Sequence, residues 1–147
     1  MSDQNGNMKT IELHENGLDI QFRIRENGVV ELADFSSQEV KKAAMEPKED
    51  IYYPAVEIHR SGTGSLNMHA YKNNINQSSV DFVYEKHELK EQDGGKELEI
   101  VMVSPEKLKA IYHMRLFDGV PAVQTWTEIT NEGSEDQGLT YVSSFIY

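Results

Sequence analysis

Two Asn-Gly turns enclose a strand of strictly alternating character near the N-terminus, and this feature constrains the fold more than any other. Between Asn16-Gly17 and Asn27-Gly28, apolar and polar residues alternate from Leu18 to Arg25. A period of two is typical of a β-strand with one buried and one wet face, and Asn-Gly is the strongest short signal for a hairpin turn. With strands at Thr10–His14 and Val29–Phe35, the segment predicts an antiparallel meander.

Short β-type segments continue to the end of the chain, and no long helical period interrupts them. We predict further strands at Val56–His59, Leu66–Tyr71, Val80–Glu85, Glu97–Val103, Lys107–Phe117, Val120–Thr130 and Leu139–Tyr147. We predict connections at Ser36–Asp50, with one or two helical turns at Glu39–Glu46 ended by Pro47, and at Ser61–Ser65, Lys72–Ser79, Leu89–Gly95 and Asn131–Gly138. Nine or ten short strands indicate an all-β, antiparallel β-sandwich.

Alternation also predicts which side chains share a face. One face of the predicted sheets carries Leu18, Ile20, Phe22 and Ile24, then Leu98, Ile100 and Met102, then Leu108, Ala110, Tyr112, Met114 and Leu116. The opposite face of the predicted strand Lys107–Phe117 carries Lys109, Ile111, His113 and Arg115. The acidic stretches Lys86–Glu91 and Glu132–Asp136 are interpreted as solvated turns.

Charge and composition exclude several classes of function. The chain has 147 residues, which suits one domain over 1–147, and its net charge of -11 disfavours nucleic acid and anionic membranes as partners. Cysteine is absent, which excludes disulfides, thiolate metal sites and a cysteine nucleophile. No secretory leader and no apolar run of about 18 residues is visible, so we expect a cytoplasmic protein. Because the sequence stops inside a predicted strand at Ser144–Tyr147, we expect the front part of a longer chain.

Three motifs, taken in order, resemble one known family. Tyr53–Gly64 combines an aromatic-proline start, a hydrophobic-Glu strand and a Gly-x-Gly turn. Glu97–Ile100 followed by Leu108–Met114 resembles the next strand pair, and Trp126–Gly133 followed by Leu139–Phe145 resembles an Asn-x-Gly turn with a YVSS strand. The sequence from about Val29 onward thus resembles the N-terminal domain of family 36 glycoside hydrolases, the α-galactosidases, and more loosely the galactose-mutarotase-like sandwiches.

The resemblance implies a large twisted β-sandwich, or supersandwich, of which this chain is one domain or a part. In the family that domain precedes a catalytic (β/α)₈ barrel, which supplies two aspartates for a retaining mechanism. We therefore expect no catalytic residue in this chain, and a parent protein that is an α-galactosidase. The implied role is accessory: to support the absent barrel, to assist assembly of a homo-oligomer and to contribute to the rim of a site for galactosides.

Four residues are candidates for contact with a sugar. His59 and Arg60 precede the Gly62-Thr63-Gly64 turn, where they either grip a ligand or simply end an exposed strand. Trp126, the only tryptophan, is either a stacking platform for a sugar ring or a core residue. Tyr53 either lies at the edge of a ligand site or of an interface, or it packs over the end of a sheet. The glycine-rich turn does not match a phosphate-binding loop.

Two other kinds of function remain open from the sequence. The chain is either an accessory domain or a free-standing carbohydrate-binding module, and a mutarotase-type aldose epimerase is a further alternative. That epimerase would need a His acid and a Glu base in contact, for which His113 and Glu128 on neighbouring strands are one pair. No two histidines have the spacing of metal ligands along a strand, so we expect no metal site and no cofactor.

Overall fold

The computed structural model describes residues 8–40, 46–48, 51–64 and 76–146. Their elements are β1 (Lys9–Glu15), β2 (Leu18–Ile24), β3 (Val30–Ser37), β4 (Ile58–Arg60), α1 (Gln77–Asp81), β5 (Val83–Gln92), β6 (Gly95–Val103), β7 (Leu108–Phe117), β8 (Val120–Asn131) and β9 (Leu139–Val142). The strands form three antiparallel sheets, in the orders β1-β2-β3, β4-β9 and β5-β6-β7-β8. The predicted all-β, antiparallel sandwich is confirmed.

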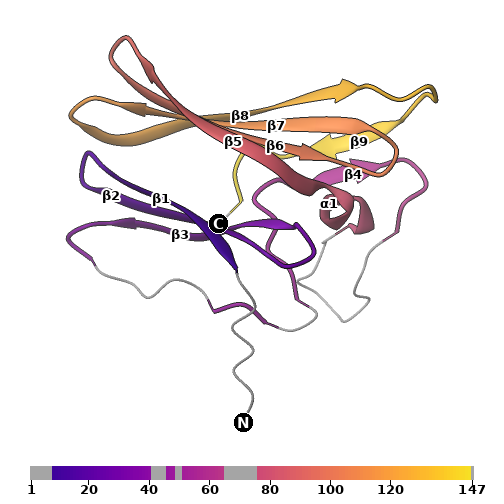
Figure 1. The fold of residues 1–147 in the computed structure, drawn as a ribbon, viewed down its shortest axis with the longest axis horizontal. Coiled ribbons are helices and arrows are strands. Elements are labelled where there is room, and N and C mark those ends of the chain that lie inside the picture. The colour runs from indigo at the N-terminus through magenta and orange to yellow at the C-terminus, as the bar shows by residue number, and fades with distance from the viewer. Residues whose placement is uncertain (1–7, 41–45, 49–50, 65–75, 147) are drawn as a thin grey trace.

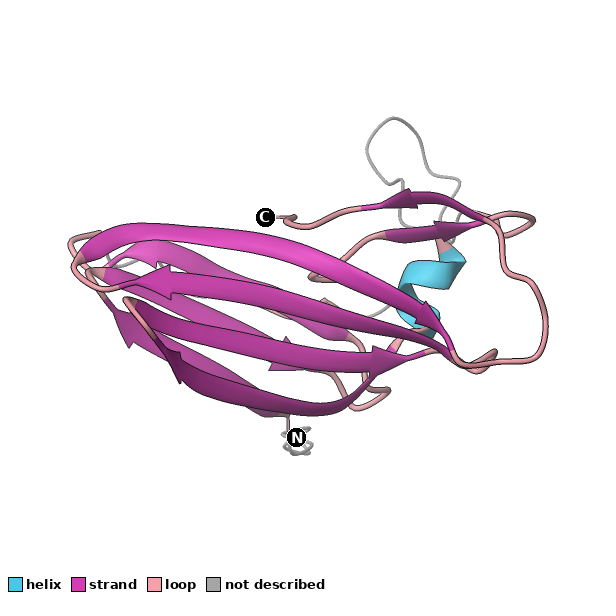
Figure 2. Ribbon diagram, turned by 90° about the horizontal axis from the view of Figure 1, so that it is seen from above, coloured by secondary structure: helices cyan, strands magenta, loops and turns pink. Residues whose placement is uncertain are grey.

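The two larger sheets lie face to face, and the pair β4-β9 lies at one end of them together with α1 (Figures 1 and 2). The hairpin of β1 and β2 turns at Asn16 and Gly17, both with positive φ (54° and 82°). A two-residue turn with two positive φ angles matches the right-handed twist of the flanking strands, which explains the Asn-Gly signal. The meander is therefore built by local turn chemistry before any distant contact is made.

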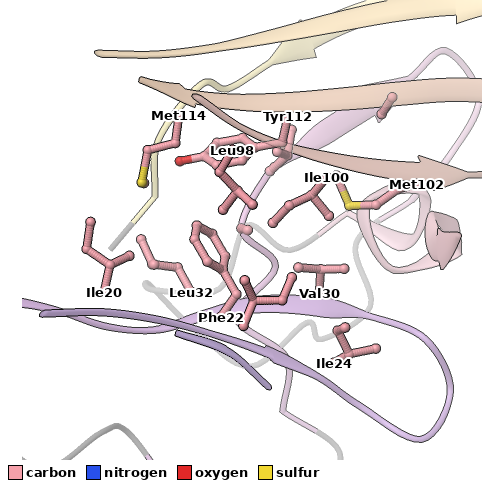
Figure 3. Packing of buried hydrophobic residues seen from close by; sticks show 14 of the residues in the cluster. Ile20, Phe22, Ile24, Val30, Leu32, Leu98, Ile100, Met102, Tyr112 and Met114 are labelled. Atoms are coloured by element: carbon pink, nitrogen blue, oxygen red, sulfur yellow. The ribbon is translucent and has the colours of Figure 1, made fainter. Parts of the chain in front are cut away.

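The hydrophobic core fills the space between these two sheets. Figure 3 shows Ile20, Phe22 and Leu32 on one side facing Leu98 and Tyr112 on the other. Phe22 and Tyr112 meet edge to face, with ring centroids 5.7 Å apart. Burial raises the pKa of the Tyr112 hydroxyl far above its ordinary value, because a phenolate in the core would lose its hydration. All twelve inward-facing residues that the alternation predicts are buried.

The small helix α1 packs against β4, whose strand partner is β9. Asn76 caps it by accepting a hydrogen bond from the backbone N–H of Ser78. The backbone N–H of Ile58 donates to Ser79 Oγ (2.9 Å), and the hydroxyls of Ser78 and Ser79 donate to the carbonyl of Ile58. No helix in the described part of the chain is long and apolar enough to cross a membrane.

Several predicted boundaries are wrong. Lys72–Ser79 is not all loop, since α1 begins at Gln77, and the strand expected at Val80 begins only at Val83. The stretch Lys86–Glu91 is not a turn but part of β5, an edge strand whose charges face water. The last strand ends at Val142 instead of Tyr147. The strand expected at Leu66–Tyr71 and most of the helical turns expected at Glu39–Glu46 lie outside the described residues.

We expect Phe22→Ala to lower the free energy of unfolding by about 3–5 kcal/mol, because the fully buried ring leaves a cavity opposite Tyr112. Urea unfolding followed by far-UV circular dichroism measures the change. Val120→Ala, on an exposed part of β8, is the control and should shift stability by no more than about 0.5 kcal/mol. A loss below about 1 kcal/mol for Phe22→Ala would contradict the two-sheet core.

Candidate functional site

The outer face of the four-stranded sheet carries a row of polar and aromatic side chains. The register pairs Glu99 of β6 with His113 of β7, and His113 with Trp126 of β8. Because the inner positions of these strands are apolar, the period of two turns this row to the opposite face. Glu97 and Glu128 lie two residues from Glu99 and Trp126 on the same face. Strand register alone thus gathers five chemically active side chains, which we call the outer cluster.

His113 lies at the centre of the outer cluster. Its side chain is only 7% exposed, and Nδ1 lies 2.9 Å from Glu97 Oε1 and 3.8 Å from Glu99 Oε1. Nε2 lies 3.6 Å from Glu128 Oε1. The ring stacks on Trp126 with a centroid distance of 4.6 Å and an interplanar angle of 6°. Three carboxylates therefore surround one imidazole whose plane is fixed by an indole.

Two further side chains hold the carboxylates in place. Gln92 Nε2 donates to Glu97 Oε2 (2.9 Å), and Lys90 Nζ donates to Glu99 Oε2 (2.7 Å). The hydrogen bond to Glu99 raises the pKa of Lys90, so the amine stays charged beside the cluster. Each carboxylate keeps its other oxygen, Oε1, toward His113. Glu97, Glu99 and His113 offer ligand atoms that lie within 4.8 Å of one another, so among the described residues these three could hold a metal.

Trp126 lies in the outer cluster and not in the core. It is half-buried, one ring face packs on His113, and its neighbours on β8 include Glu128. Trp126 is absent from the buried hydrophobic cluster between the sheets. The structure therefore places Trp126 on the outer face of the four-stranded sheet.

His59 and Arg60 lie on β4, in the two-stranded sheet with β9, and have different environments. His59 Nε2 lies 2.8 Å from Glu57 Oε1, and its ring packs against the exposed Tyr141 of β9. Arg60 is 7% exposed and forms ion pairs with Asp81 (3.0 Å) and Glu106 (2.7 Å). Arg60 thus joins β4 to α1 and to the β6–β7 turn, while His59 stays accessible.

Tyr53 lies beside a buried ion pair of the three-stranded sheet. Its backbone N–H donates to Glu31 Oε1 (2.9 Å), and Glu31 Oε2 lies 2.8 Å from Nη2 of Arg23. The side chain of Glu31 is 0% exposed. The adjacent Tyr52, which forms an aromatic cluster with Tyr53 and Pro54 in the sequence, accepts a hydrogen bond from Asn27 and packs under Arg25. The four predicted residues therefore occupy three different places and form no single site.

A groove of about 490 Å³ opens at the end of the four-stranded sheet, between the β6–β7 turn and the loop after β8. It is lined by Pro105, Glu106, Lys107, Glu132, Gly133, Ser134, Glu135 and Gln137. Arg60 supports one wall through its ion pair with Glu106. Sequence reasoning assigned the acidic loop to solvent and missed the groove, because only the fold brings the turn and the loop together.

Sequence reasoning also missed the core of the outer cluster. It considered His113 with Glu128, but not Glu97 and Glu99, because spacing rules for metal or catalytic histidines look along one strand. Applying the alternation to β6 and β7 together would have placed Glu97, Glu99 and His113 on the same face of the sheet. Only the register, which pairs Glu99 with His113, makes them neighbours.

No protein-family model matches the chain, and no curated protein matches it. Among solved structures, the fold matches the family 36 α-galactosidase AgaA from Geobacillus stearothermophilus, with a TM-score of 0.57 and 12% identity over 86% of this chain. This fold is that of one part of a family 36 α-galactosidase. A double variant of the same enzyme in complex with raffinose matches with a TM-score of 0.55 and 11% identity over 85% of this chain.

The match covers only a small part of the enzyme. The chain corresponds to 23% and 22% of the two α-galactosidase chains. The likeness to family 36 indicated by the sequence motifs is confirmed at the level of the fold. At 12% identity, the fold is what the two proteins share.

We expect the ion pair of Glu106 with Arg60 to make stability depend on pH. Burial alone would raise the pKa of Glu106, but hydrogen bonds from Arg60 and Ser104 outweigh it and hold the pKa below its ordinary value of 4.5. A lowered pKa in the folded state adds stability above the unfolded value, and this is lost as pH falls through the folded value. Glu106→Gln should therefore lower stability at pH 7, by about 1 kcal/mol or less because the side chain is 41% exposed.

Urea unfolding of wild type and variant at pH 7 and at successively lower pH values measures this contribution. The difference between the two proteins should vanish once Glu106 is protonated. Glu85→Gln, at an exposed position of β5, is the control and should show no such trend. A difference that grows as pH falls would contradict the assignment.

Proposed function

We propose that this chain is a non-catalytic N-terminal accessory domain of an α-galactosidase. The observation that carries the proposal is the fold match, which covers 86% of this chain but only 23% of the α-galactosidase. A unit that accounts for less than a quarter of an enzyme, and that resembles the family's domain before the barrel, is expected to support catalysis performed elsewhere. In this proposal residues 1–147 act as one domain, and the parent protein works in the cytoplasm.

Exposed apolar side chains near the C-terminal end support a docking role. Leu139, Tyr141 and Phe145 are 41%, 49% and 40% exposed, and Phe145 packs edge to face on Phe35 of β3 at 5.3 Å. Exposed apolar side chains favour contact with another protein surface. We assign this surface to the absent catalytic barrel or to a second subunit of a homo-oligomer.

A carbohydrate-binding module is the second candidate function, and Trp126 favours it. A half-buried indole with Glu128 beside it offers a stacking face and a hydrogen-bond acceptor for a galactoside. His59, on a separate surface, offers a second polar edge. An epimerase of the mutarotase type is less favoured. His113 does approach Glu128, but it is 7% exposed and engaged with Glu97, so a sugar ring oxygen has no access to it.

The test is to read the native gene beyond the codon for Tyr147 and to assay two proteins against p-nitrophenyl α-galactoside. The chain of 147 residues should release no nitrophenol above the buffer rate, and the product of the whole reading frame should hydrolyse the substrate. Hydrolysis by the short chain, or a frame that encodes no barrel, would overturn the proposal. Saturable binding of galactose or raffinose by the short chain, lost in Trp126→Ala, would favour the binding module instead.

A matched pair of variants tests the docking surface in the whole-frame product. Leu139→Ser should lower the thermal stability of that protein, because it places a hydroxyl in an interface with the rest of the chain. Val120→Ser is the control, since Val120 is similarly exposed but lies at the start of β8 in another sheet. Equal effects of the two changes would argue against the assignment of this surface.

A further inference from the structure

Three carboxylates surround the imidazole of His113. A neutral imidazole carries one N–H and one lone pair. If the proton is on Nδ1, where it is donated to Glu97, the lone pair of Nε2 faces Glu128 Oε1 at 3.6 Å. If the proton is on Nε2, the lone pair of Nδ1 faces Glu97 at 2.9 Å and Glu99 at 3.8 Å. Either tautomer therefore places a lone pair against carboxylate oxygen.

One of these nitrogens lacks a hydrogen bond. Nε2 of His113 is buried and has no hydrogen-bond partner among the residues that the structure describes, and the whole side chain is 7% exposed. Buried polar atoms without a partner are rare and call for an explanation such as an ion. This unsatisfied nitrogen is an observation separate from the gathering of carboxylates at Nδ1, and a ligand on Nδ1 that leaves the proton on Nε2 would turn an N–H toward Glu128.

The carboxylates are already oriented for a ligand on the Nδ1 side. Gln92 and Lys90 hold Oε2 of Glu97 and of Glu99, which leaves both Oε1 atoms directed at Nδ1. Metal sites commonly use outer hydrogen bonds of this kind to fix ligating carboxylates. Trp126 fixes the plane of the imidazole in the same way by stacking on it.

We propose that Glu97, Glu99 and His113 bind one divalent transition-metal ion of the Zn²⁺ type, with His113 ligating through Nδ1. Binding at Nδ1 places the imidazole proton on Nε2, where it can be donated to Glu128. Nδ1 then has a ligand, and Nε2 turns an N–H instead of a lone pair toward Glu128 Oε1, which needs a small side-chain shift from 3.6 Å to accept it. A carboxylate behind a ligating histidine is the usual arrangement in zinc sites. The inference is independent of the proposed function.

The distances suit such an ion. Bonds of about 2.0–2.2 Å to a tetrahedral Zn²⁺ ion place neighbouring ligand atoms about 3.3–3.6 Å apart. The separations of 2.9 and 3.8 Å from Nδ1 to the two carboxylates bracket that value, so small side-chain shifts complete the site. One imidazole and two carboxylates favour Zn²⁺ over Ca²⁺ or Mg²⁺, which prefer six or more oxygen ligands. The fourth position is open to water.

A bound ion would join β6 to β7 on the face that carries Trp126. Because metal binds the folded cluster and not the unfolded chain, it would stabilise the protein in proportion to the logarithm of its concentration. The competing occupant of the same position is a proton, which would make His113 an imidazolium ion. The two occupants differ in one respect that can be measured, since only the metal gives a saturable response at constant pH.

Trp126 is the reporter for the experiment, because it is the only tryptophan and stacks directly on His113. The purified chain, freed of metal with a chelator, is titrated with Zn²⁺ at constant pH while indole emission is recorded. Isothermal titration calorimetry gives the stoichiometry. We expect a saturable change in emission at one Zn²⁺ per chain, and no change with Ca²⁺ or Mg²⁺ at the same concentrations.

Three variants assign the site. His113→Gln and the milder Glu99→Gln, whose side chain is 23% exposed, should each weaken Zn²⁺ binding by about tenfold or more. His14→Gln is the matched control, because His14 also lies beside two carboxylates, Glu12 and Asp19, but is 62% exposed. It should leave the emission change intact. Far-UV circular dichroism verifies that each variant is folded.

Two results would overturn the proposal. The first is the absence of a saturable emission change in the wild-type protein, which would leave a proton as the occupant of the cluster. The second is a change that persists in Glu99→Gln but disappears in His14→Gln, which would place the ion at the exposed histidine.

Discussion

The structure depends on one constraint: two antiparallel sheets must bury their apolar rows against each other. The edge-to-face contact of Phe22 with Tyr112 lies in the middle of that interface, between strands 90 residues apart in sequence. Each residue turned toward this core sends its neighbours to the outer face. The composition of the outer surface is therefore set by the same alternation that forms the core, and a slip of one residue in strand register would exchange the two faces.

The outer cluster is a consequence of that constraint. Leu98 and Ile100 point inward from β6, so Glu97 and Glu99 must point outward. On β7, Tyr112 and Met114 point inward, so His113 between them must point outward. The antiparallel register then places Glu99 opposite His113 and His113 opposite Trp126. Buried charge on an outer face is costly unless it is paired. This cost explains why Lys90 and Gln92 donate hydrogen bonds to Glu99 and Glu97, and why a cation is expected within the cluster.

The sequence predicts the regular part of the fold and misses the irregular part for physical reasons. Alternation located the buried rows of β2, β6 and β7, because a half-buried strand needs the period of two. It could not locate α1, whose residues Ser78 and Ser79 are polar yet buried through hydrogen bonds to Ile58. For the sites, Trp126 was singled out by type alone, whereas Arg60 looked accessible until its ion pairs with Asp81 and Glu106 were known.

The central claim is that the two faces of the four-stranded sheet have separate roles, one as core and one as polar surface. Nuclear Overhauser contacts measured on labelled aromatic side chains test it directly. The account predicts contacts between the rings of Phe22 and Tyr112 and, separately, between those of His113 and Trp126, whose centroids lie 5.7 and 4.6 Å apart. Contacts between Trp126 and Phe22 would place the indole in the core, and would contradict both the register and the outer cluster.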